Sequence, residues 1–162
     1  TETNRQSLEK LLDAADGALK VFDVNFRPPF DDHARTRELA RAAGLVKLNH
    51  DEVAAMVDGS PDDYEMNARK LSEECGVENV CVTAGDAGAG MLQKGQWTWE
   101  PGRAVTVADT VGAGDSFLAT LVGGLLREKP VAEVLAEACR IAEWVATQRG
   151  AQPDYANLKK ES

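Results

Sequence analysis

Strand-forming and helix-forming segments alternate along this chain, and that alternation constrains the fold more than any other feature. Short apolar runs predict strands over residues 19–25, 45–49, 79–83 and 104–107, and a hairpin over 91–93 and 96–100. Helices are expected around Leu8–Ala15, from a cap at Asp31 or Asp32 to about Ala43, and over 51–57, 62–75, 116–127 and 131–149. This order predicts one α/β domain over residues 1–162, a three-layer sandwich around a mostly parallel sheet.

Polar residues stand where three of the predicted strands end. In parallel sheets, ligands bind beyond the carboxyl ends of the strands. We therefore expect a binding site at this edge of the sheet. The residues concerned are Asp23, Asn25 and Arg27 at the end of the first strand, Lys47, Asn49 and Glu52 at the end of the second, and Thr83 and Gly85 at the end of the third.

Length and charge narrow the classes of function. A chain of 162 residues with 43% hydrophobic residues can bury about 70% of its unfolded surface without disulfides or metal. The formal net charge of −9 argues against binding to nucleic acid, which requires a basic face. A small phosphorylated ligand remains possible, because backbone N–H groups and Mg²⁺ can hold its phosphates.

The three cysteines, Cys75, Cys81 and Cys139, form no C-x-x-C pair. We read them as buried free thiols in a reducing compartment. No apolar run approaches the length of a membrane span, and the N-terminus is polar. A soluble, cytoplasmic protein without membrane partners is expected.

The most specific motif is the string D-T-V-G-A-G-D-S-F over residues 109–117. Gly112, Ala113 and Gly114 leave the backbone open, so consecutive N–H groups can face an anion at a helix N-terminus. Asp115 falls in the first turn of that helix, where the helix dipole favours an ionised proton acceptor. The simpler alternative is a glycine turn followed by an ordinary N-terminal helix acid.

This string resembles the C-terminal signature of ribokinase-like (phosphofructokinase-B type) carbohydrate kinases. The resemblance implies that residues 112–114 form an anion hole and that Asp115 deprotonates the acceptor hydroxyl. It also places Thr110 among the nucleotide-binding residues. Thr120 departs from the small residue usual in the family, at a helix-packing position.

The segment Asn49-His50-Asp51-Glu52 resembles the family's N-x-x-E motif. The resemblance implies that Asn49 and Glu52 organise Mg²⁺ and the nucleotide phosphates through water, with Lys47 nearby on the nucleotide. An alternative is a helix capping box, with Asn49 as the cap and Glu52 three residues on. Both roles can hold at once.

Residues 23–29 (DVNFRPP) resemble the D-x-N-x-R segment of fructokinase-like and 2-keto-3-deoxygluconate kinase-like members. By that resemblance Asn25 reaches toward the transferring phosphate. Arg27 is a bidentate donor suited to phosphate or a substrate carboxylate. The alternative is an exposed turn with a surface pair between Arg27 and Asp31.

Residues 82–88 resemble the family's V-T-x-G-x-x-G turn, which would lay Thr83, Gly85 and Gly88 along the nucleotide. Alone this signal is weak, because a plain approach to the following hairpin has the same glycines. The late Gly150-Ala151-Gln152-Pro153 fits the family's G-A-x-P ending beside the adenine.

The resemblance runs along nearly the whole chain but matches only the C-terminal half of the family's fold. The N-terminal part, with most sugar-binding residues and the lid, is therefore expected to be missing. The chain would then leave an apolar edge at residues 19–24, where a second copy or an N-terminal half could pair. The resemblance implies ATP- and Mg²⁺-dependent phosphoryl transfer to a sugar hydroxyl, with fructose favoured. A keto-deoxy sugar acid is the alternative substrate, and a nucleotide-binding fragment inactive on its own is the alternative function.

Overall fold

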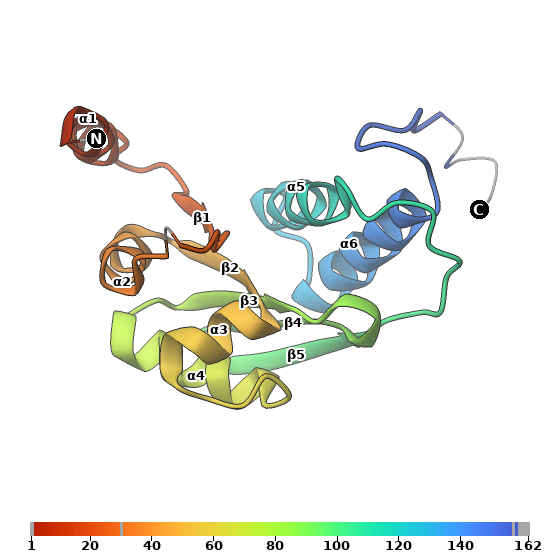
Figure 1. The fold of residues 1–162 in the computed structure, drawn as a ribbon, viewed down its shortest axis with the longest axis horizontal. Helices are drawn as coiled ribbons and strands as arrows, with labels where there is room; N and C mark the ends of the chain where they lie inside the picture. The colour runs from red at the N-terminus through yellow and green to blue at the C-terminus, as the bar shows by residue number, and fades with distance from the viewer. Residues whose placement is uncertain (1, 30, 157, 159–162) are drawn as a thin grey trace. The chain divides into compact units, whose positions relative to one another are not determined.

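A computed structural model describes residues 2–29, 31–156 and 158. Helices and strands alternate as expected (Figure 1). The elements are α1 (Glu2–Ala14), β1 (Val21–Asp23), α2 (His33–Ala42), β2 (Leu45–Asn49), α3 (His50–Val57), α4 (Tyr64–Cys75), β3 (Asn79–Thr83), the 3₁₀ turn η1 (Gly85–Ala87), β4 (Gly88–Gln93), β5 (Gln96–Pro101), α5 (Ala113–Leu126) and α6 (Val131–Ala146).

One sheet contains the five strands in the order β1-β2-β3-β4-β5, with β1 at its end. β1 and β2 are parallel, and Val21 lies opposite Leu45 in their register. β4 and β5 form the predicted hairpin, in which Lys94 and Gly95 both have positive φ, as a tight two-residue turn requires. The predicted α/β class with a mostly parallel sheet is confirmed.

The chain divides into two compact units. The first contains residues 1–82 and 92–96, and the second contains residues 83–91 and 97–162. The expectation of a single domain over residues 1–162 stays a prediction. Among the described residues, no helix combines the length and the apolar character that crossing a bilayer needs.

In the first unit the core forms around β2. Residues 45–48 are all buried, as expected for a strand covered on both faces. Their neighbours in the core come from α3, α4 and β3 and include Val53, Met56, Leu71 and Val80, each 0% exposed. α4 ends where predicted, because Gly76 adopts the left-handed conformation of a C-cap.

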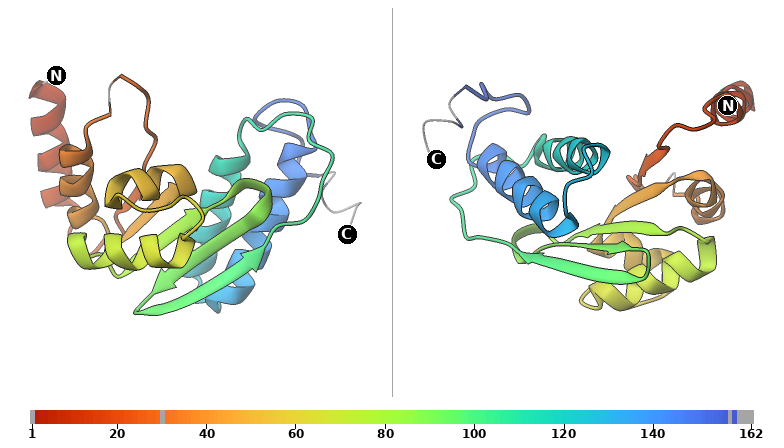
Figure 2. Two further views of the ribbon diagram at one scale, coloured as in Figure 1. Left: turned by 60° about the horizontal axis from the view of Figure 1, so that its bottom comes forward. Right: turned by 180° about the vertical axis from the view of Figure 1, so that it is seen from behind.

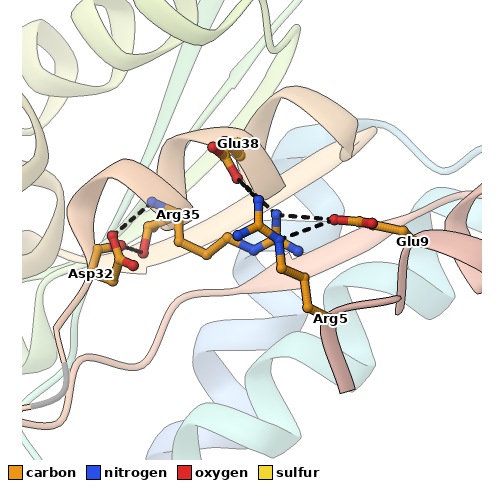
Figure 3. A network of polar contacts seen from close by, with 6 residues as sticks. Arg5, Glu9, Asp32, Arg35 and Glu38 are labelled. Carbon is orange, nitrogen blue, oxygen red and sulfur yellow. Dashed lines mark hydrogen bonds and ion pairs between the residues drawn. The ribbon is translucent and has the colours of Figure 1, made fainter. Parts of the chain in front are cut away.

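Helix α1 contacts α2 through charged side chains and not through a buried apolar face. None of its residues is buried, and Leu11 is 66% exposed. Its link to α2 is a network of charges in which Arg5 and Arg35 alternate with Glu9 and Glu38 (Figure 3). The N···O distances are 3.2 Å for Arg5–Glu9, 3.7 Å for Arg5–Glu38, 3.7 Å for Arg35–Glu9 and 2.7 Å for Arg35–Glu38. Leu8 and Leu11 of this helix are exposed, and Leu12 is partly buried.

In the second unit α5 and α6 run side by side, as both views of Figure 2 show in teal and blue. Close approach depends on Gly124, since a Cβ there would lie 2.7 Å from both methyl groups of Val134. Phe117 and Leu121 of α5 and Leu135 and Val145 of α6 are buried.

One expectation was wrong. Residues 104–107 form no strand, although Val105 and Val107 favour one; both side chains are exposed. The backbone there is tied to α6 at both sides, because Arg103 N donates to Glu143 Oε1 at 2.8 Å and Ala108 N donates to the Ala146 carbonyl at 2.8 Å. On β5 the rings of Trp97 and Trp99 stack, with centroids 6.3 Å apart.

Candidate active site

Asp23, the last residue of β1, lies beside Lys47, the middle residue of β2. The register places them opposite each other, and Lys47 Nζ lies 2.9 Å from Asp23 Oδ1. Lys47 is only 9% exposed. Charge rather than a well-directed hydrogen bond holds this pair, since Asp23 Oδ1 has no partner of hydrogen-bond geometry. The lysine ammonium is therefore neutralised within the first unit, and its contact with a nucleotide stays a prediction.

The Asn49-x-x-Glu52 segment forms the capping box that was the simpler alternative. Asn49 Oδ1 accepts from Glu52 N at 2.8 Å, and Glu52 Oε2 accepts from Asn49 N at 2.8 Å. This confirms the structural interpretation of the spacing and positions both side chains at the start of α3. Their role toward Mg²⁺ stays a prediction.

Glu52 makes a further contact that the sequence did not reveal. Its Oε1 accepts a hydrogen bond from Phe26 N at 3.0 Å, and the residue is 7% exposed. The Phe26 ring stacks on His33 at 4.8 Å between centroids. Nothing in the local pattern could indicate this link, because 26 residues separate the two partners.

Asn25 and Arg27 flank Phe26 and are both exposed. Arg27 Nη1 donates to the Phe26 carbonyl at 3.1 Å. Beside them the first unit has a cavity of about 380 Å³, a volume typical of small-molecule sites. Its walls come from the end of β1, the following loop and the start of α2: Phe22, Asp23, Val24, Asn25, Phe26, Arg27, Asp31, Asp32, Arg35 and Thr36.

In the second unit, Gly112 is the N-cap of α5 and has a φ of 84°, a conformation that favours glycine. A Cβ at this position would also collide with the carbonyl oxygen of Ala151. Helix α5 begins at Ala113, three residues earlier than predicted, so Ala113 and Gly114 join Asp115 in its first turn. Asp115 is exposed there, in the helical position predicted for it.

The start of α5 has no side-chain cap, because its N-cap residue is a glycine. Ala113 N donates a hydrogen bond to the Thr110 carbonyl at 3.2 Å. The first N–H groups of a helix have no acceptor within the helix and carry its positive dipole end. The role of residues 112–114 as an anion hole, and of Thr110 beside a nucleotide, stays a prediction.

Asp109 organises this loop through both of its carboxylate oxygens. Its Oδ1 accepts from Val111 N at 3.0 Å and its Oδ2 accepts from Gly150 N at 3.2 Å. The first bond is the local Asx-type turn that an aspartate two residues before its donor can make. The second joins the loop to the Gly150–Ala151 segment, and only the structure shows it.

The glycines of the 83–88 turn have structural reasons of their own. Gly85 opens η1 with a φ of 57°, and Ala84 N donates to the Gly88 carbonyl at 2.8 Å. Gly88 has a φ of 123°, and a Cβ there would collide with the Glu100 carbonyl. These contacts fit the hairpin interpretation, and a nucleotide role for Thr83, Gly85 and Gly88 stays a prediction.

The predicted residues are thus gathered in two groups. The first unit brings together Asn25, Arg27, Lys47, Asn49 and Glu52 around the ends of β1 and β2, and the second unit carries Thr83, Gly85, Gly88, Thr110 and residues 112–115. Within the part of the chain that the structure describes, no three His, Cys, Asp or Glu side chains are grouped to hold a metal by themselves.

Comparison with known proteins identifies the family. Residues 1–157 match the pfkB family carbohydrate kinase model. The chain belongs to this family. It is 31% identical over 149 residues to Fructokinase-2 of Oryza sativa subsp. japonica, covering 85% of this chain and 44% of that protein. It is 36% identical over 114 residues to the fructokinase of Klebsiella pneumoniae, covering 67% of this chain and 36% of that protein.

The fold of this pfkB family chain is ribokinase-like. The crystal structure of fructokinase from Vibrio cholerae O395, with fructose, ADP and calcium ion bound, superposes with a TM-score of 0.82 at 23% identity. That match covers 96% of this chain and 55% of the fructokinase. The chain therefore spans about half the length of its relatives, or less.

Proposed function

We propose that this chain carries the nucleotide-binding and catalytic residues of an ATP-dependent carbohydrate kinase. The observation that carries the proposal is the placing of Asp115, which is exposed in the first turn of α5 directly behind Gly112, Ala113 and Gly114. Phosphoryl transfer needs a group that accepts the proton of the attacking hydroxyl, next to donors for the charge that develops. This turn offers both.

In the proposed reaction a sugar hydroxyl loses its proton to Asp115 while its oxygen bonds to the γ-phosphorus of ATP. The bond from that phosphorus to the β–γ bridging oxygen breaks, and ADP leaves. N–H groups of residues 112–114 donate to the oxygens that gain negative charge. Asn25 and Arg27, exposed beside the cavity of the first unit, are proposed to contact the transferred phosphate or the acceptor.

Asn49 and Glu52 fit the family's Mg²⁺ through water rather than by direct ligation. Both Glu52 oxygens already accept backbone N–H bonds, yet each keeps a second acceptor position for a metal-bound water. Mg²⁺ normally retains several waters and takes one or two carboxylates plus phosphates. When bound, the metal would neutralise phosphate charge, while Asn49 and Glu52 hold its waters.

Fructose is the proposed acceptor, supported by identity of 31% and 36% to two fructokinases. The exposed Arg27 beside the cavity favours one alternative, a sugar acid whose carboxylate it would bind. A second alternative is a chain that binds nucleotide without turnover, because it covers only 44% of its rice relative.

We further propose that the exposed end of the sheet is completed by another strand. β1 stands last in the sheet order, and Val21 is 37% exposed. A second copy or the N-terminal half of a longer protein would supply that strand. The three buried free thiols support a reducing compartment such as the cytoplasm.

Calorimetry tests the nucleotide site most directly. The chain, titrated with ATP at millimolar concentration, is expected to bind it weakly with Mg²⁺ present and more weakly with EDTA. A coupled ADP-release assay with fructose, other hexoses and a keto-deoxy sugar acid then tests turnover. Absence of any Mg²⁺-dependent ATP binding would contradict the proposal, and binding without sugar-dependent ADP release would favour the inactive fragment.

A further inference from the structure

The geometry points to Glu52 as a positioning residue for the loop that contains Asn25 and Arg27. We propose that its carboxylate fixes this loop to the start of α3, in addition to any part it has in organising a metal. That Asn25 and Arg27 contact phosphate rests on the proposed function, whereas the fixing of the loop does not.

The carboxylate bridges two backbone N–H groups that are distant in sequence. Oε2 accepts from Asn49 N at 2.8 Å, and Oε1 accepts from Phe26 N at 3.0 Å. Glu52 is 7% exposed, so water competes weakly for either bond. Hydrogen bonds to an ionised acceptor are also stronger than those between neutral groups.

Phe26 is held on a second side as well. Its ring stacks on His33 at 4.8 Å with an interplanar angle of 10°, so α2 fixes the side chain while α3 fixes the backbone. Just before it, Val24 N donates to the Lys47 carbonyl at 2.9 Å, which continues the pairing of β1 with β2. The exposed neighbours Asn25 and Arg27 thus project from a residue anchored to two helices.

A carboxylate suits this geometry better than an amide. It presents an acceptor at both oxygens, whereas a glutamine presents one oxygen and one NH₂ donor. In Glu52→Gln the NH₂ group must oppose one of the two N–H groups, so at least one bond is lost. If the amide oxygen keeps the capping bond to Asn49 N, the bond to Phe26 N is the one that breaks.

Amide hydrogen exchange measured by NMR on the whole chain tests this. In the unmodified chain, Phe26 N–H is expected to exchange at least tenfold more slowly than an unstructured amide. Glu52→Gln should raise its exchange rate at least tenfold. Asp51→Asn is the matched control, because it removes one carboxylate from the same helical turn, at a side chain 75% exposed, and should change the Phe26 rate less than twofold.

The Val24 amide reports whether the strand pairing survives in Glu52→Gln, and its exchange rate should change less than twofold. An unprotected Phe26 amide in the unmodified chain would overturn the proposal without any variant. Unchanged protection of both the Phe26 and the Asn49 amides in Glu52→Gln would also overturn it, because the variant can keep only one of the two bonds. None of these readouts requires ATP, so a chain that fails to bind Mg·ATP can still show the Glu52-dependent protection. In that case the proposed function fails and the positioning role stands.

Discussion

Asp109 Oδ2 accepts a hydrogen bond from the Gly150 amide at 3.2 Å, across 41 residues of sequence. Its other oxygen accepts a hydrogen bond from Val111 N, and Val111 directly precedes Gly112, the N-cap of α5. One side chain therefore sets the distance between the loop ahead of Asp115 and the segment after α6.

Removing that side chain should free both amides. We expect Asp109→Ala to destabilise the chain by about 1 kcal/mol, the usual net value of such bonds near a surface, and to speed amide exchange at Val111 and Gly150. Asp154→Ala is the control, because Asp154 makes a bond of the same local kind, to Ala156 N at 3.0 Å. It should leave the Gly150 amide unchanged, and equal effects of the two variants would contradict the assignment.

Asp115→Asn tests the proposed base. In protein that contains this chain and turns over a sugar, the variant should bind Mg·ATP normally while kcat falls by about 10²-fold or more. The amide is nearly the size of the carboxylate but accepts no proton. Steady-state kinetics with calorimetry measure both quantities, and turnover near that of the unmodified protein would remove Asp115 from the mechanism.

Two adjacent glycines of α5 should respond oppositely to alanine. A Cβ at Gly124 meets the Val134 methyls at 2.7 Å, whereas a Cβ at Gly123 meets only the flexible Arg127 guanidinium, at 3.3 Å. Alanine favours a helix over glycine by about 1 kcal/mol, so Gly123→Ala should raise Tm. Gly124→Ala should lower it, because overpacking costs about 1–3 kcal/mol. Thermal unfolding followed by circular dichroism measures the Tm of each variant. Similar Tm shifts in the two variants would show that α5 and α6 leave room for a Cβ at residue 124 and would contradict the prediction.

The attachment of α1 should depend on pH and salt. A hydrogen bond from Arg35, in the same helix α2, lowers the pKa of Glu38 below its ordinary value of 4.5, and the charge of Arg5 on α1 lowers this pKa further. Only the part due to Arg5 stabilises the attachment of α1; it is present above the ordinary value and is lost as pH falls through the lowered one. Protease cleavage within α1 should therefore speed up near pH 3 with an acid-active protease, and in about 1 M salt at pH 7, where exposed charges are screened. Glu38→Gln should weaken both responses, and cleavage independent of salt would contradict this account.

The thiols should be inert in the folded chain. Burial raises the pKa of Cys139 to about 12 and also raises the pKa of Cys75. The thiolate that reacts with alkylating reagents is then scarce at pH 8. Mass spectrometry after iodoacetamide treatment should find little labelling in buffer and three labelled cysteines in denaturant. Rapid labelling of Cys139 in buffer would show that its surroundings open readily.

Local patterns predicted the local structure well. The Asn49–Glu52 spacing allowed a capping box as the alternative to a metal motif, and that box is present. Gly76 predicted a helix end and the Lys94-Gly95 pair a hairpin, because each depends on residues within one turn. The string around Asp115 identified the family for the same reason.

Contacts between distant segments could not be predicted in this way. The Asp23–Lys47 pair requires the register of β1 against β2, and the Phe26–Glu52 bond requires the path of the loop after β1. Residues 104–107 show the opposite error. Their preference for a strand is local, but backbone bonds to α6 decide their conformation.

The indole of Trp97 lies where a Cβ of Gly90 would otherwise be. Side chains alternate between the two faces of a strand, so sliding β5 by one residue against β4 would move this indole to the other face. Sliding it by two in one direction would press the indole against Leu92, which has a Cβ. Sliding it by two in the other would bring the indole to Gly88, where backbone atoms of Glu100 and Gly102 already occupy the space of a Cβ. Gly90 on β4, which has no Cβ, and the large ring of Trp97 on β5 therefore fit together in one alignment of the two strands only.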